Sequence, residues 1–159
     1  MSELEKLIET VKILRSENGC PWDREQTFES LKPGCIEEAA EVICGINIYK
    51  ETGNVDNFVE ELGDLLLQII MHAQIASEAG LFNIEDVARE ENEKMIRRHP
   101  HVFSDEKIDT SEEVLKRWAQ IKEKEKTGKE WMNSRLPEAF NESEELINKA
   151  RERKGFTGK

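Results

Sequence analysis

Acidic side chains form two closely spaced pairs, Glu38 with Glu41 and Glu61 with Asp64. Residues three apart share a face of a helix, so the two carboxylates of each pair project together. Apolar residues at helical spacing place both pairs on the shoulder of a face that is directed to the core. Four carboxylates gathered beside a core repel one another unless a cation lies among them. This pattern predicts a site for a hard divalent ion, Mg²⁺ with Mn²⁺ as a substitute.

Three other structures could explain the acidic pairs: a solvated helix face, a di-iron centre and an EF-hand. A single E-x-x-D pair is usually a solvated helix face, and it is the presence of two pairs on consecutive helices that favours a metal site. Di-iron carboxylate bundles require Glu-x-x-His motifs, and neither pair has a histidine three residues on. The chain also lacks a D-x-D-x-D-G loop, which argues against an EF-hand.

The hydrophobic periodicity predicts an all-α protein, an antiparallel helical bundle whose helices are completed by oligomerisation. Pro33 and Gly34 predict a break or a bend, and the second helix is expected to begin near Thr27 or after Gly34. Gly45 lies on the acidic face, where close approach of a ligand or a neighbouring helix would explain it. The helices are expected at residues 2–17, 27–49, 57–78, 84–98 and 111–126, with a short helical stretch near 142–152 in a C-terminal extension, residues 127–159. The end of this extension, residues 155–159, is expected to fray.

Composition limits the classes of function. The chain has 159 residues, a net charge of −11 and no apolar run of membrane-spanning length. A duplex nucleic-acid partner is disfavoured by that charge, whereas a nucleotide held through a metal is not. Three cysteines without a C-x-x-C pair indicate reduced thiols, and the N-terminus lacks signal-peptide character. These features predict a cytoplasmic protein without a nucleic-acid or membrane partner.

The stretch Leu65–Met71 is apolar nearly all round, which is typical of a helix that is buried on several sides. A small bundle cannot easily bury the whole circumference of such a helix. We therefore expect a homo-oligomer, most simply a dimer, in which Leu67 and Ile70 contact a second copy. His72, on an apolar shoulder, is expected to be a core residue rather than a metal ligand.

Cationic and aromatic residues outside the acidic pairs are candidates for substrate binding. Trp22 either packs on the bundle or forms a flat wall for a base. Lys94, Arg97 and Arg98 precede Pro100 at the end of a helix. They are explained equally well by a favourable helix C-terminus and by a phosphate clamp.

Four separated motifs together resemble the MazG nucleoside triphosphate pyrophosphohydrolases. The likeness runs in order over about residues 1–126, and Trp118–Lys122 is also similar to that family. The motifs are Cys20-Pro21-Trp22-Asp23, the E-E-x-x-E of residues 37–41, Glu61-Leu62-Gly63-Asp64 with the leucines that follow, and Arg97-Arg98-His99-Pro100-His101-Val102-Phe103.

The resemblance implies an all-α hydrolase that acts as a dimer or larger assembly with Mg²⁺ and splits a nucleoside triphosphate into monophosphate and pyrophosphate. It implies that residues 1–126 are the catalytic domain. Many relatives have two such domains, and residues 150–156 look like the beginning of a second. The same resemblance implies that the metal ligands are Glu38, Glu41, Glu61 and Asp64, and that Glu37 is an acid that assists them. It also implies that Arg97 and Arg98 bind phosphate, with Lys122 as a weaker candidate for the same role.

The residues fit this chemistry independently. A carboxylate-held Mg²⁺ lowers the pKa of a bound water, and Glu37 or Glu41 can orient or deprotonate that water. Arg97 and Arg98 can steady the leaving pyrophosphate. Two rivals stay open: a narrower enzyme for dUTP, dCTP or phosphoribosyl-ATP, and a non-catalytic helical module that dimerises and binds a partner.

Overall fold

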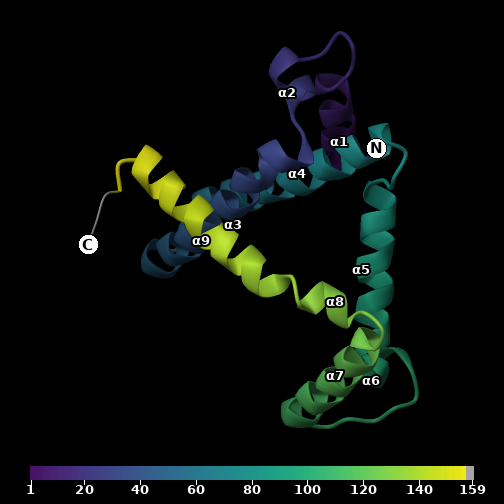
Figure 1. The fold of residues 1–159 in the computed structure, drawn as a ribbon. Coiled ribbons are helices and arrows are strands. Elements are labelled where there is room, and N and C mark those ends of the chain that lie inside the picture. The colour runs from purple at the N-terminus through teal and green to yellow at the C-terminus, as the bar shows by residue number, and fades with distance from the viewer. Residues whose placement is uncertain (157–159) are drawn as a thin grey trace. The chain divides into compact units, whose positions relative to one another are not determined.

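The computed structural model describes residues 1–156, which form helices joined by short loops, with no strand in this range (Figure 1). The all-α prediction is confirmed. The helices are α1 (Glu3–Leu14), α2 (Pro21–Glu25), α3 (Phe28–Thr52), α4 (Asp56–Glu78), α5 (Ile84–Arg98), α6 (Pro100–Phe103), α7 (Ser111–Lys126), α8 (Glu130–Asn133) and α9 (Leu136–Arg153). The fraying predicted for residues 155–159 falls largely on 157–159, which lie outside the described residues.

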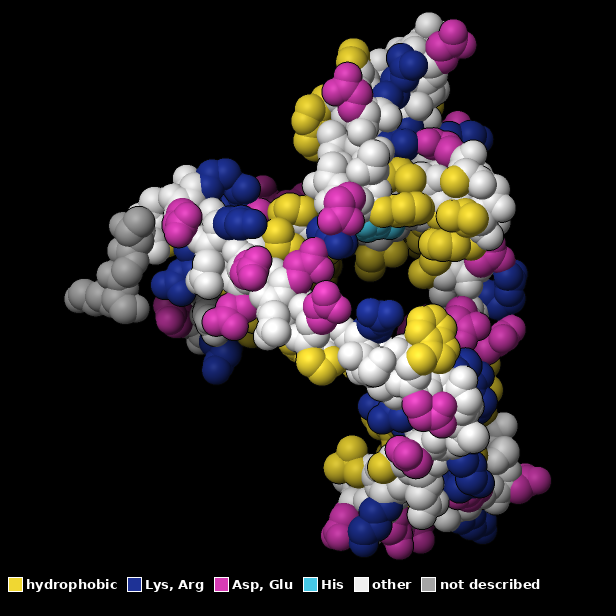
Figure 2. Space-filling view, in the orientation of Figure 1, with side chains coloured by type: hydrophobic (Ala, Val, Ile, Leu, Met, Phe, Trp, Pro, Cys, Tyr) yellow, Lys and Arg dark blue, Asp and Glu magenta, His cyan; other side chains and the backbone are white. Residues whose placement is uncertain are grey.

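Two compact units make up the chain. One consists of residues 1–84 together with the C-terminal segment that begins at Glu142, and the other of residues 85–141. Acidic and basic side chains are interspersed over the face shown in Figure 2, with apolar side chains exposed among them. Over residues 1–156, none of the helices has the length and apolar character that a membrane crossing requires.

Helices α3 and α4 form the centre of the first unit and run antiparallel. Gly34, early in α3, lies against Gln68 in the second half of α4, and Gly45, late in α3, lies against Phe58 in its first turn. A Cβ atom added to Gly45 would stand 2.8 Å from the Phe58 Cα, so only glycine permits this approach. The close neighbour that explains Gly45 is therefore a helix and not a ligand.

Replacing Gly45 with alanine is expected to destabilise the fold by about 1–3 kcal/mol, because the added methyl group pushes two backbones apart. Gly63→Ala is the matched control, since a Cβ atom there meets nothing within 4 Å and improves helix propensity by up to about 1 kcal/mol. Urea unfolding of both variants measures the difference. A Gly45→Ala chain as stable as Gly63→Ala would contradict the close packing.

The core of the first unit lies between α1, α3 and α4. Its buried side chains are Val11, Leu31, Ile70 and Met71, with Leu67 packed against them. The prediction that Ile70 and Leu67 face a second copy is therefore wrong for Ile70, which is 1% exposed within a single chain. Helix α1 packs on this face of α4, for which the hydrophobic periodicity alone did not identify a neighbouring helix. Exposed apolar residues on α3 and α4 lie elsewhere, at Ile43, Ile46, Val59, Leu62 and Ile69.

An ion pair joins the end of α1 to the end of α4. The Arg15 guanidinium donates to both carboxylate oxygens of Glu78, at 2.9 and 2.7 Å, and also to the Asp23 carbonyl in α2. Arg15 has only 6% of its side chain exposed. This hydrogen bonding holds the pKa of Glu78 below its usual value of 4.5.

A lowered pKa means that Glu78 stabilises the fold at neutral pH and that this contribution is lost as pH falls through its folded pKa. Glu78→Gln is expected to cost about 1 kcal/mol at pH 7, because a charge-assisted pair is lost. The cost should shrink as pH falls below 4.5. Urea unfolding at pH 7 and at a series of acidic pH values measures it, and an equal cost throughout would contradict the ionic role.

Several helix ends differ from the prediction. Helix α3 begins at Phe28, which agrees with the earlier of the two predicted starts, but it continues through Pro33 without the predicted break, because Thr27 and Ser30 form a capping box that starts the helix before the proline. The Ser2–Glu5 capping box also forms, but α1 ends at Leu14, earlier than expected. The connection after it contains the short helix α2. Helix α9 is longer than the predicted stretch, and its last apolar turn is buried at Ala150.

In the second unit, α5, α6 and α7 pack through His99 and the Trp118 ring, whose centroids lie 5.5 Å apart. Helix α7 spans the predicted residues and is capped by Thr110, whose hydroxyl oxygen accepts from the Glu113 amide. Arg117 of α7 pairs with Glu106 at 2.7 Å and ties the preceding loop to the helix. These contacts position the basic C-terminal end of α5.

Candidate metal centre

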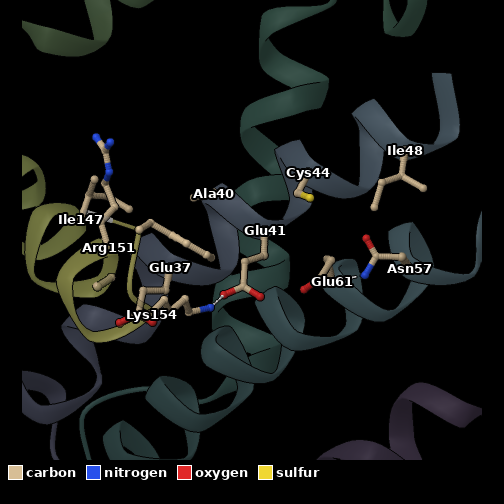
Figure 3. A pocket seen from close by; sticks show the side chains of 12 residues that line it. Glu37, Ala40, Glu41, Cys44, Ile48, Asn57, Glu61, Ile147, Arg151 and Lys154 are labelled. Atoms are coloured by element: carbon tan, nitrogen blue, oxygen red, sulfur yellow. Dashed lines mark hydrogen bonds and ion pairs between the residues drawn. The ribbon is translucent and has the colours of Figure 1, made fainter. Parts of the chain in front are cut away.

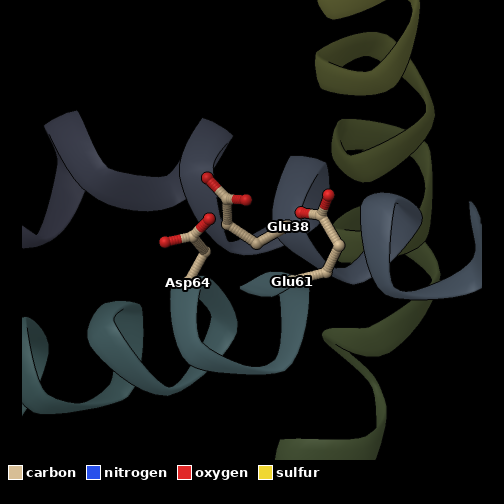
Figure 4. A group of neighbouring side chains, drawn as sticks. All are labelled: Glu38, Glu61 and Asp64. Atoms are coloured by element: carbon tan, nitrogen blue, oxygen red, sulfur yellow. The ribbon is translucent and has the colours of Figure 1, made fainter. Parts of the chain in front are cut away.

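Three carboxylates from α3 and α4 meet at one place. Glu38 comes from α3, whereas Glu61 and Asp64 come from one turn of α4 (Figure 4). One oxygen from each of the three lies within 4.8 Å of the others. The three-residue spacing of Glu61 and Asp64 places both on the face of α4 that is turned to α3. The structure thus brings together three of the four predicted metal ligands.

Glu61 is the most deeply placed of these acids, with 8% of the residue exposed. Its Oε1 accepts a hydrogen bond of 2.7 Å from the Asn57 side-chain amide, one turn earlier on α4. The Asn57 Oδ1 is buried and has no hydrogen-bond partner within the described residues. Sequence reasoning missed Asn57. Its position four residues before Glu61, on the same helix face, was the available signal.

The pKa of Glu38 is raised above its usual value. Burial is the main cause, followed by the negative charges of Glu41, Asp64 and Glu61. Within the described residues, neither Glu38 nor Asp64 forms an ion pair with a basic side chain. The repulsion predicted from the sequence is therefore present between α3 and α4.

This donor set fits a hard divalent cation. All three side chains offer carboxylate oxygens, the ligands that Mg²⁺ and Mn²⁺ prefer. Oxygens on opposite sides of one such ion are separated by about 4–5 Å, given bond lengths of about 2.0–2.6 Å. The oxygens of the cluster lie within 4.8 Å of one another and so are no farther apart than one ion allows. An ion there would also relieve the repulsion that raises the Glu38 pKa.

The two other α3 acids predicted to belong to the site are paired with basic residues at the end of α9. The Glu41 carboxylate pairs with the Lys154 ammonium, and the Glu37 carboxylate with the Arg153 guanidinium. Glu41 lies beside the cluster, with Lys154 directed to it (Figure 3). Sequence reasoning placed no site residue in this segment, although Arg151, Arg153 and Lys154 form a basic run in an acidic chain.

A pocket of about 340 Å³ opens next to the cluster, between α3, α4 and α9 (Figure 3). Glu41 and Glu61 form its polar side, with Asn57 beside them, and the stems of Ile48 and Ile147 form part of its apolar wall. Trp22 does not line it, and its side chain is 64% exposed on α2. Trp22 therefore does not form the predicted flat wall for a base in this pocket.

Residues 26–103 match the family model for the MazG nucleotide pyrophosphohydrolase domain. That range contains the carboxylate cluster and all of α3 and α4. The chain belongs to the MazG family through this domain. The resemblance drawn from the motifs is thereby confirmed.

Curated relatives agree with this assignment. The chain is 51% identical over 134 residues to the nucleoside triphosphate pyrophosphohydrolase/pyrophosphatase MazG of Thermotoga maritima, covering 84% of this chain and 49% of that protein. It is 43% identical over 130 residues to the nucleoside triphosphate pyrophosphohydrolase of Escherichia coli, covering 81% of this chain and 48% of the relative. The chain thus spans about half the length of these two relatives. A third relative, the uncharacterized protein YabN of Bacillus subtilis, is 47% identical over 120 residues, which are 76% of this chain and 24% of YabN.

The basic residues predicted to bind phosphate lie in the second unit of this MazG chain. Arg97 and Arg98 both donate to the Glu125 carboxylate of α7, at 2.7 Å from each guanidinium. This pairing lowers the pKa of Glu125 and raises that of Arg97. Lys94 pairs with Glu91 on its own helix. Lys122 lines the same surface hollow as Lys94 and both arginines. The structure thus gathers the four predicted cations into one basic surface.

Proposed function

We propose that this chain hydrolyses nucleoside triphosphates, NTP or dNTP, to the monophosphate and pyrophosphate, with Mg²⁺ as the metal and Mn²⁺ as its substitute. The observation that carries the proposal is the cluster of Glu38, Glu61 and Asp64 within a MazG domain. Two relatives are named for this activity. Removing unwanted nucleotides, or controlling the nucleotide pool, is the role that such an activity serves.

In this proposal Glu38, Glu61 and Asp64 hold the metal, with Glu41 as a fourth ligand. A divalent ion held by these residues would supply positive charge for the phosphates and would lower the pKa of an attacking water. Glu37 or Glu41 orients that water and accepts its proton. Asn57 keeps the Glu61 carboxylate turned toward α3 through its amide hydrogen bond. The position of these residues in or beside the cluster supports the proposed roles.

Arg97 and Arg98 are proposed to hold the phosphates of the substrate, together with Lys94 and Lys122. Their shared surface supplies several positive groups in one hollow. In the free chain the Glu125 carboxylate pairs with both guanidinium groups, so a bound phosphate has to displace this carboxylate. Arginine forks suit that exchange, because phosphate accepts the same paired hydrogen bonds as carboxylate.

The homo-oligomeric state is proposed as well, with a dimer as its simplest form. Exposed apolar side chains on α3 and α4, such as Ile43, Val59 and Leu62, support a contact with a second copy. The three cysteines are free thiols, which supports a reducing, cytoplasmic setting. The division of the chain at residue 126 stays a prediction.

A panel of nucleotides tests the activity directly. The chain is incubated with each NTP and dNTP, with dUTP and with phosphoribosyl-ATP, in the presence and absence of Mg²⁺, and released pyrophosphate is assayed. Release from several triphosphates, only with the metal, is the expected result. Release from a single substrate would favour the narrow enzyme. No release from any of them would favour the non-catalytic binding module and contradict the proposal.

A further inference from the structure

The basic C-terminal end of α9 lies on the same acidic surface as the metal cluster. Its partners are the two α3 acids that flank Glu38: Arg153 pairs with Glu37, and Lys154 pairs with Glu41. A third pair, Lys32 with Glu142 at 2.9 Å, fixes the start of this segment to α3. Ala150 is buried in the contact, so the position of the helix end does not depend on the ion pairs alone.

The negative charge of this surface limits what can bind there. Glu37, Glu38, Glu41, Glu61 and Asp64 are close together, and a polyphosphate is itself strongly anionic. One divalent ion does not offset five carboxylates and a polyphosphate. Groups that carry positive charge next to the ion are therefore needed, since an unscreened approach of like charges costs several kcal/mol.

Arg153 and Lys154 are suited to this need. A divalent ion that takes the Glu41 oxygens competes with the Lys154 ammonium for them, so the ammonium has to leave. The Arg153 side chain is 62% exposed, whereas its partner Glu37 is 12% exposed. The Lys154 side chain is itself 36% exposed, so both cationic groups reach solvent. The Lys154 stem is flexible enough to turn from the carboxylate to a neighbouring anion.

We propose that Arg153 and Lys154 are polyphosphate-binding residues, held by Glu37 and Glu41 in the free chain and transferred to phosphate oxygens when a divalent ion and its ligand bind. The inference rests on the proposed function, because it takes the cluster as the metal site. Both residues belong to the same unit of the chain as the carboxylate cluster. Arg151 is not included, since its guanidinium points away from Glu41 in Figure 3.

The first test measures binding without turnover. Inorganic tripolyphosphate in excess Mg²⁺ is titrated into the full chain, and Mn²⁺ alone is titrated separately, both followed by calorimetry. Lys154→Gln and Arg153→Gln should each weaken tripolyphosphate binding about tenfold, because each loses a charge-assisted hydrogen bond. Lys154→Arg should restore most of the loss. Lys149→Ala, an exposed lysine on the same helix, is the matched control and should change nothing.

The Mn²⁺ titration separates phosphate binding from a role as counter-ion. With the cations removed, Mn²⁺ should bind as tightly as in the parent chain, or more tightly. Tighter Mn²⁺ binding with unchanged tripolyphosphate binding would show counter-ions only and overturn the proposal. If Mn²⁺ binding and tripolyphosphate binding weaken equally and the melting temperature falls, the two cations have a structural role, and the proposal is overturned as well.

A second test uses the parent chain and depends on no variant. Acetylation of Lys154, read by peptide mass spectrometry against Lys149, should be slow in the free chain, faster with Mg²⁺ alone, and slow again with Mg²⁺ and tripolyphosphate. No protection by tripolyphosphate would overturn the inference even if nucleotides are hydrolysed. Protection in a chain that hydrolyses no nucleotide would sink the proposed activity and leave this binding site standing.

Discussion

Asp64→Asn and Glu38→Gln are each expected to lower pyrophosphate release at saturating Mg²⁺ by about 10²–10³-fold, a loss of the size seen when one group that stabilises transition-state charge is removed. Both changes keep the size of the side chain and remove one anionic oxygen donor. The loss should appear in kcat at every nucleotide that the parent chain hydrolyses. Coupled assay of pyrophosphate measures it.

Glu60→Gln is the control for this prediction. Glu60 neighbours Glu61 on α4 and is exposed, outside the cluster. The Glu60→Gln substitution removes one negative charge from α4, as Asp64→Asn does. A general electrostatic effect on turnover would therefore appear in the Glu60→Gln chain as well. The expected result is turnover within about twofold of the parent chain, since exposed charges have small effects. A Glu38→Gln chain that keeps its turnover would refute the ligand assignment.

The second large effect concerns stability with and without the ion. At a free Mg²⁺ concentration of about 100 times its dissociation constant, the parent chain should gain about 2.7 kcal/mol. Asp64→Asn and Glu38→Gln should lose most of this gain. In the absence of metal, Glu38→Gln should instead be more stable than the parent chain. The raised pKa of Glu38 means that its charge opposes folding at neutral pH.

Urea unfolding in EDTA and in Mg²⁺ measures both parts of this prediction. The apo advantage of Glu38→Gln should vanish as pH falls below the raised pKa, because the parent carboxyl is then neutral as well. A Glu38→Gln chain that is less stable than the parent in EDTA at pH 7 would show that this carboxylate makes favourable contacts in the free chain. Burial and the repulsion of the neighbouring acids would then be outweighed by those contacts.

The sequence predicted the helical core of this site well, because its signals are local. Glu61 and Asp64 are one turn apart on a helix with clear periodicity, and Glu38 follows the same pattern on its neighbour. The short connection at Gly53 then sets the two helices antiparallel. Thr110 and Ser2 start their helices as the capping rules require.

Features that depend on residues distant in the sequence were not predicted. Ile70 was assigned to a contact between copies because periodicity cannot tell which helix covers a face, and α1 covers it here. The pairs of Glu37 with Arg153 and Glu41 with Lys154 join residues more than 110 positions apart. One local feature also differs: a break or a bend was expected at Pro33, but the Thr27 capping box starts α3 ahead of it. For Ile70 and the two ion pairs, tertiary packing decides what local preference leaves open.

Diffraction data from crystals soaked in Mn²⁺, collected near the manganese absorption edge, test most directly whether the acids of α3 and α4 share an ion. An anomalous peak is expected between these helices, within bonding distance of carboxylate oxygens of Glu38, Glu61 and Asp64. That peak should be absent from Asp64→Asn crystals that otherwise diffract equally well. A Mn²⁺ ion bound elsewhere, with these three carboxylates turned to solvent, would contradict the assignment of the metal centre.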